Sequence, residues 1–188
     1  MKADTPSILI IYTGGTIGMI NKPADGSLKP FDLEKIMEHI PEILRLGYRI
    51  ESHSFQPPID SSDIQPSTWR RLAEIIKENY KDFDGFVILH GTDTMAYSAS
   101  ALSFMLEDLA KPVIFTGSQL PMGTLRTDGK ENLITSIVMA AARENDLPVV
   151  PEVCIYFESK LSRGNRTSKI SAEQFNAFQS ANYPYLAN

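Results

Sequence analysis

The sequence has little cysteine, no excess of basic residues and no long apolar run. Cys154 is the single cysteine among 188 residues, which excludes a framework of disulfide bonds and is compatible with reducing conditions. Lys and Arg total 18 against 23 for Asp and Glu, and the resulting net charge of −5 argues against nucleic acid as the main partner. No stretch approaches the roughly 18 consecutive apolar residues of a membrane span, so no membrane partner is expected either.

The remaining composition is that of an ordinary globular protein. Hydrophobic residues make up 43% of the chain and charged residues 22%. A chain of this length buries on the order of 70% of its surface and needs neither disulfide bonds nor a metal to hold a core. The first apolar run, from Ile8 to Tyr12, is too short for a signal peptide, so a cytoplasmic location is the default expectation.

Short apolar runs alternate with helical patterns along the chain. The runs predict strands at Ser7–Tyr12, Arg49–Phe55, Gly85–His90, Pro112–Thr116 and Glu152–Phe157. Four of them are almost continuously apolar, which is typical of strands buried on both faces, whereas the second alternates. Helical patterns begin at Asp32, at Ser67, near Thr94 and near Lys130. This alternation predicts an α/β fold with a doubly wound, mostly parallel open sheet and right-handed crossovers.

The C-terminal part of the sequence has a different composition. After the last predicted strand the chain becomes polar and basic, and it ends without a helix cap or a charged tail. We therefore expect residues 1–188 to form one domain, with a polar tail or the start of a linker over about 158–188.

Small, hydroxyl-rich or acidic loops follow four of the predicted strands. They are Thr13–Gly18, Asp60–Asp63, His90–Thr94 and Thr116–Gln119. Taken singly, each loop is explained by ordinary turn and N-cap residues. In a parallel sheet, however, all four would meet at the edge where ligands bind. Their concentration of hydroxyl groups favours acyl chemistry there.

Other kinds of site find weaker support in the sequence. The first loop has the pattern G-G-x-x-G rather than G-x-G-x-x-G, and neither a P-loop nor a G-x-S-x-G motif is present. His39 and His53 lie in helix and strand patterns, and His90 closes a buried strand, where a hydrogen-bonding core role is favoured over that of a base. Neither the histidines nor Cys154 has metal-ligand spacing, so no metal site is predicted.

Five segments of the chain, in order, resemble the bacterial L-asparaginase family, in particular its cytoplasmic type I branch. They are TGGTIGM, DSSD, DGFVILHGTDTMAYSASALSFML, KPVIFTGSQ and RGNRTSK. The resemblance covers essentially the whole chain and implies the N-terminal catalytic domain of a protein that continues into a second α/β domain. It also implies hydrolysis of L-asparagine, with L-glutamine as a candidate second substrate, through an acyl-threonine intermediate and with no cofactor.

The resemblance assigns catalytic roles to four residues. Thr16 matches the nucleophile, although without the motif a role as N-cap of the following segment would be favoured. Thr92 and Asp93 match the second catalytic motif, and Lys169 is implied to lie beside them as a base. The alternative for Lys169 is a solvated loop lysine, as most lysines are.

The resemblance also implies the groups that bind substrate. Asp60, Ser61 and Ser62 match a loop that holds the α-amino and α-carboxylate groups, and Thr92 and Asp93 contribute to the same site, with Asp93 facing the α-ammonium. Backbone N–H groups near Thr92 are suited to an oxyanion. Ser118 matches a position near the departing amide nitrogen.

The sequence departs from the family at one notable place and leaves other functions open. The family often has a tyrosine on the loop after the nucleophile, but Asn21–Pro30 contains none.

The family assembles as a dimer or a dimer of dimers, so a homodimer or homotetramer is expected. The asparaginase-like subunit of archaeal glutamyl-tRNA amidotransferase carries similar motifs after an extra N-terminal domain, and a non-catalytic amino-acid or nucleotide binding module remains a further alternative.

Overall fold

The computed structural model describes residues 5–21, 28–30 and 40–188. Its centre is a six-stranded sheet in the order β10-β9-β6-β5-β1-β4. Five of the strands are parallel, and only β10 runs antiparallel to its neighbour. The strands are β1 Ser7–Tyr12, β4 Arg49–Ser54, β5 Gly85–Leu89, β6 Val113–Thr116, β9 Val153–Phe157 and β10 Lys160–Arg163.

This sheet confirms the predicted fold class, a doubly wound and mostly parallel α/β domain. All five predicted strands are present, four of them one residue shorter than expected. Every residue of β1, β5, β6 and β9 is buried, whereas the alternating β4 lies at the edge and stays partly exposed. Strands covered on both faces need apolar residues at every position, and this is why continuous runs predicted them.

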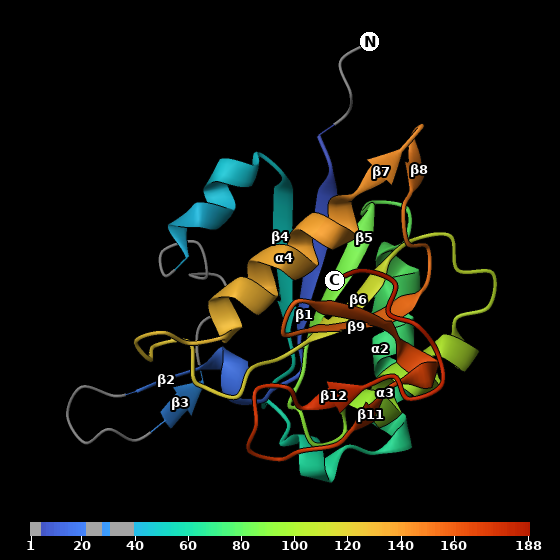
Figure 1. Ribbon diagram of the computed structural model, residues 1–188. Helices are drawn as coiled ribbons and strands as arrows, with labels where there is room; N and C mark the ends of the chain where they lie inside the picture. The colour runs from blue at the N-terminus through green and yellow to red at the C-terminus, as the bar shows by residue number, and fades with distance from the viewer. Residues whose placement is uncertain (1–4, 22–27, 31–39) are drawn as a thin grey trace.

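In the part of the chain that the structure describes, three α-helices cover the two faces of the sheet (Figure 1). α4, Gly129–Ala141, packs on one face against Ile8, Ile10 and Tyr12, among others. α2, Pro66–Asn79, and α3, Met95–Met105, pack on the other face, where alternate residues of the same strands point. Among the described residues, no helix is long and apolar enough to cross a membrane.

The predicted helix boundaries were correct to within a few residues, with two differences. α2 begins at Pro66 with Gln65 as its N-cap, not at a cap on Ser67, because a proline suits the first helical position. α3 ends at Met105, about four residues early, before Asp108 adopts a φ of 52°. The helix predicted from Asp32 lies in residues that the structure does not describe, and a 3₁₀-helix, η3, follows at Pro41–Leu46.

The segment over 158–188 differs from the polar tail or linker expected there. β10 pairs with the edge strand β9, and Leu161 is fully buried. Phe178 packs its ring against Phe157 with centroids 5.0 Å apart. A few apolar side chains are thus enough to dock a mainly polar segment onto the sheet, and average polarity does not reveal them.

Short elements join these layers. Near the end of β1 lie the 3₁₀-turn η1, Thr16–Gly18, and a hairpin of β2, Met19–Asn21, with β3, Leu28–Pro30. The others are η4 Ser61–Asp63, β7 Arg143–Glu144, β8 Leu147–Pro148, η5 Gly164–Arg166, β11 Ser168–Lys169 and β12 Phe178–Gln179.

Candidate active site

The sheet topology marks one place where a ligand pocket is expected. The chain leaves β1 to form β4 on one side and then β5 on the other, so the crossover direction reverses between β1 and β5. In open parallel sheets, ligands bind beyond the carboxyl ends of the strands at such a switch point. A pocket of about 320 Å³ lies at these ends.

Three of the four predicted strand-end loops line this pocket. The lining residues are Gly15, Thr16, Met19, Pro58, Ile59, Asp60, Ser61, Gly91, Thr92 and Asp93. The loops after β1, β4 and β5 therefore converge as the sequence predicted, although they lie far apart along the chain.

Glycines allow the three loops to touch one another through their backbones. Gly14 and Gly15 have φ angles of 144° and 90°, which L side chains rarely adopt. A Cβ on Gly14 would lie 2.0 Å from the carbonyl oxygen of Ile59, and one on Gly15 would lie 2.5 Å from Cα of Gly91. Side chains at these positions would force the loops apart and open the pocket.

Lys169 comes from the C-terminal segment and contacts two residues of the pocket wall. Its ammonium donates hydrogen bonds to Thr92 Oγ1 at 2.9 Å and to Asp93 Oδ1 at 2.7 Å. The Lys169 side chain is only 15% exposed, whereas that of Asp93 is 62% exposed. The structure thus brings Lys169 together with Thr92 and Asp93, as the resemblance implied. Thr16 lines the same pocket from η1 and is partly exposed.

The loop after β4 presents a preorganised carboxylate. Ser62 donates to Asp60 Oδ1 from both its backbone N–H and its hydroxyl, each at 2.9 Å. These hydrogen bonds hold the pKa of Asp60 below its usual range. Ser61 is 4% exposed, and its carbonyl accepts a bond of 2.6 Å from Thr94, which ties this loop to the one after β5. No pattern in the sequence singled out Thr94 for this role.

Ser118 is placed differently from the other predicted site residues. It is 3% exposed, and its hydroxyl donates to the carbonyl oxygen of Leu120 at 2.6 Å rather than lining the pocket. Its neighbour Gln119 extends instead to the segment after Lys169, where its amide donates to the carbonyl oxygens of Ala172 and Gln174. The fourth loop therefore supports the site from outside the pocket.

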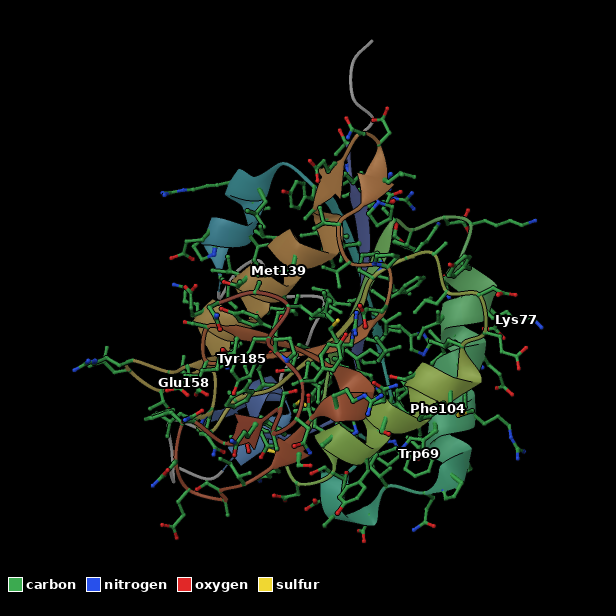
Figure 2. All side chains as sticks on the ribbon, turned by 45° about the vertical axis from the view of Figure 1, so that its right-hand side comes forward. Trp69, Lys77, Phe104, Met139, Glu158 and Tyr185 are labelled. Atoms are coloured by element: carbon green, nitrogen blue, oxygen red, sulfur yellow. The ribbon has the colours of Figure 1, made fainter. Side chains whose placement is uncertain are left out.

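His90 lies beneath the site as a core residue, which agrees with its predicted role. Its Nδ1–H donates to the Gly91 carbonyl at 2.7 Å, so Nε2 accepts from Ser98 at 2.9 Å. Trp69, on α2 beside α3 in Figure 2, donates to the same Ser98 hydroxyl. Burial lowers the pKa of His90 to about 4, so the ring stays neutral. A neutral, fully bonded histidine is a structural support and not a proton carrier.

This burial predicts a specific loss of stability in acid. An unfolded histidine takes up a proton near pH 6.5, but native His90 does so only near 4. Between these values the unfolded state binds more protons, so the free energy of unfolding should fall as the pH drops, by at most about 1.4 kcal/mol per pH unit. Denaturant titrations from pH 7 to 4 measure this slope. His90→Gln should flatten it, and the control His53→Gln, on the edge strand β4, should not; equal slopes for the wild type and His90→Gln would contradict the prediction.

No metal site emerges from the described part of the chain, where no cluster of three or more His, Cys, Asp or Glu side chains could hold an ion. Two threonine side chains, two carboxylates and glycine backbone line the pocket, and the Lys169 ammonium contacts its wall. These are the groups of acyl transfer and amino-acid binding.

Fold and pocket together define a doubly wound α/β protein with a hydroxyl- and carboxylate-lined site for a small molecule at its switch point. Residues 7–188 match the family model described as Asparaginase, N-terminal. The chain therefore belongs to the asparaginase family.

Individual relatives agree with this assignment. L-asparaginase 1 of Escherichia coli (strain K12) is 49% identical over 181 residues, which are 96% of this chain and 52% of that protein. The 60 kDa lysophospholipase of Mus musculus is 43% identical over 203 residues, covering 96% of this chain and 35% of that protein. The crystal structure of L-asparaginase I from Vibrio cholerae O1 biovar eltor str. N16961 superposes with a TM-score of 0.85 at 48% identity, over 97% of this chain and 53% of that one. The chain thus spans about half the length of these asparaginases.

Proposed function

We propose that this chain carries the catalytic site of an amidohydrolase that converts L-asparagine to L-aspartate and ammonia through an acyl-threonine intermediate. The observation that supports this most strongly is the contact of Lys169 with both Thr92 and Asp93, at the wall of the pocket that Thr16 lines. A lysine held beside a hydroxyl in this way is placed to pass a proton to and from a reacting group.

In the proposed reaction, Thr16 Oγ attacks the amide carbon of the substrate. The threonine proton passes through the Thr92 hydroxyl, which lines the pocket, to the side-chain nitrogen of Lys169 that contacts it. The C–N bond then breaks, and the amide nitrogen leaves as ammonia with a proton returned from Lys169. Water hydrolyses the acyl-threonine ester by the same relay. Backbone N–H groups near Thr92 stabilise the oxyanion in both steps.

Substrate recognition is assigned to the acidic and hydroxyl groups around the pocket. Asp93 and Asp60, whose pKa is held low, supply negative charge for the α-ammonium group. Ser61, which lines the pocket, supplies a hydroxyl donor for the α-carboxylate, and Ser62 contributes by holding the Asp60 carboxylate with its hydroxyl and N–H groups. A volume of about 320 Å³ suits a single small amino acid, so L-glutamine is a candidate second substrate.

The size and chemistry of this pocket favour an amino acid over a long acyl chain. A lysophospholipid would need an extended apolar groove beside the nucleophile, but in this pocket Met19, Pro58 and Ile59 share the lining with glycines, hydroxyl groups and two carboxylates. A largely apolar hollow does lie elsewhere, between α2 and the C-terminal end of α3, and Tyr80, Leu106 and Leu109 are among the residues that line it. It is thus at the opposite end of α3 from Asp93.

Ammonia release from L-asparagine, L-glutamine and no substrate tests the proposed function. Release with asparagine well above the blank supports it, and the ratio to glutamine measures the preference. Specific binding of aspartate without any ammonia release would instead identify a non-catalytic amino-acid binding module. We place the protein in the cytoplasm as a homodimer or homotetramer, which light scattering of the purified protein can test.

We expect the 188-residue chain alone to fold but to release ammonia slowly. A second hollow of about 610 Å³ lies beside Asp93 and Lys169, lined in part by Tyr97 and Ile170, which are 70% and 55% exposed. Exposed apolar side chains next to the site are typical of a surface that another domain covers. Without that domain, water would reach the site and weaken the interactions between its charged groups.

The expected low activity of the short chain is tested by steady-state ammonia assays. These compare the 188-residue chain with a longer form that includes a second domain. The longer form should have a much higher kcat/KM, while weak aspartate binding survives in the shorter chain. Comparable kcat/KM values would show that one domain is sufficient.

A further inference from the structure

Tyr12, the last residue of β1, lies directly beneath the turn that carries Thr16. Its side chain is 1% exposed. Its hydroxyl donates to the carbonyl oxygen of Gly18 at 3.2 Å and lies 3.4 Å from that of Gly15. These two carbonyls stand at either end of η1, so one phenol spans the turn.

We propose that Tyr12 is a positioning residue that holds η1 in the conformation in which the Thr16 hydroxyl faces the pocket. This inference rests on the proposed function, in which Thr16 is the nucleophile. Tyr12 itself is not among the residues that line the pocket, and its hydroxyl contacts the backbone of the turn.

Tyr12 adds to the few other contacts that hold the turn, among them the side chain of Ile17, which is buried in the core. η1 has only three residues and is closed by two backbone hydrogen bonds, from Gly18 N–H to Gly15 O at 3.2 Å and from Met19 N–H to Thr16 O, with no side-chain cap at its N-terminus. Gly15 and Gly18, at the two ends of the turn, add conformational freedom to the unfolded chain that folding must remove. A displacement of about 1 Å at a reacting group can cost on the order of 100-fold in rate.

The ring of Tyr12 also fits the turn closely. A Cβ on Gly18 would lie 2.1 Å from the Cε2 and Cζ atoms of the ring, so the ring forms the floor on which the turn rests. Burial raises the pKa of Tyr12 to about 12. The phenol therefore remains a hydrogen-bond donor at any working pH, and it contributes geometry rather than proton transfer. In this respect it does not replace the tyrosine that the loop after η1 lacks.

The test is Tyr12→Phe, which keeps the ring and removes the hydroxyl, made in the form of the protein with the highest asparaginase activity. The matched control is Tyr156→Phe, a buried tyrosine of β9 in the same core cluster. Loss of one hydrogen bond to the turn should lower kcat about tenfold. KM for asparagine should stay within about twofold, because the substrate-binding groups lie on other loops. The control should keep both constants.

Hydrogen exchange gives a second readout that does not depend on activity. The Gly18 amide, which closes η1, should exchange faster in Tyr12→Phe than in the wild type or Tyr156→Phe. Wild-type kcat together with wild-type exchange at Gly18 would overturn the proposal, as would equal losses of kcat in both variants. If the wild type releases no ammonia at all, the proposed function fails, and exchange at Gly18 alone then supports or overturns the role of Tyr12.

Discussion

Replacing Thr16 with alanine should lower kcat for L-asparagine by at least about 10³-fold. The side chain sits on a short, partly exposed turn at the pocket, so its loss should remove the attacking hydroxyl and leave the core intact. The thermal unfolding midpoint should therefore stay close to that of the wild type. Steady-state ammonia release and a thermal melt of the same preparation measure both quantities.

Thr16→Ser is the matched control for this prediction. It keeps a hydroxyl on the same turn and removes only a methyl group, so it should retain most of the activity. Near-normal turnover by Thr16→Ala would remove Thr16 from the role of nucleophile, and equal losses in both variants would point to disturbed packing of the turn.

Replacing Lys169 with methionine should lower kcat by about 10² to 10³-fold while aspartate binding changes little. The ammonium contacts Thr92 and Asp93, and its proposed work is proton transfer rather than recognition of the substrate. Asp93→Asn should weaken both kcat and binding, because we also assign that carboxylate to the α-ammonium of the substrate. Kinetic constants and the dissociation constant of aspartate separate the two effects.

Lys160→Met provides the comparison for the lysine variant. Lys160 lies on β10 in the same C-terminal segment, but it donates to Asn176 and is not part of the pocket lining. This variant should behave like the wild type. If Lys169→Met raised only KM and left kcat unchanged, the assignment of Lys169 as the proton carrier would be wrong.

The sequence predicted the buried parts of the fold better than its edges. Strands such as β5 and β6 are apolar at every position because both faces are covered, and this pattern requires no knowledge of their neighbours. The docking of the segment after β9 depends on single residues, Leu161 and Phe178, which meet partners that local composition does not reveal. Helix ends shifted where a proline or a positive φ, as at Pro66 and Asp108, overrode the periodicity.

The candidate site could be predicted only in part, because some of its contacts join residues that are distant in the sequence. The loops after β1, β4 and β5 follow directly from the parallel topology, which places strand ends together. The contact of Lys169 with Thr92 joins residues 77 positions apart, and only the resemblance pointed to it. Strand and helix patterns do not report side-chain packing. They therefore could not predict the hydrogen bond of buried Ser118 to the Leu120 carbonyl or the position of Tyr12 beneath η1.

In the proposed mechanism Thr16, and not Thr92, carries the acyl group. The two hydroxyls line the same pocket, and the structure places Lys169 on Thr92, so the geometry makes Thr92 the natural competitor. The decisive measurement is to mix the active enzyme with L-asparagine, quench in acid within milliseconds, and map the acylated peptide by mass spectrometry. The mechanism predicts one aspartyl ester on Thr16 that is absent from Thr16→Ala. An ester on Thr92 would contradict it.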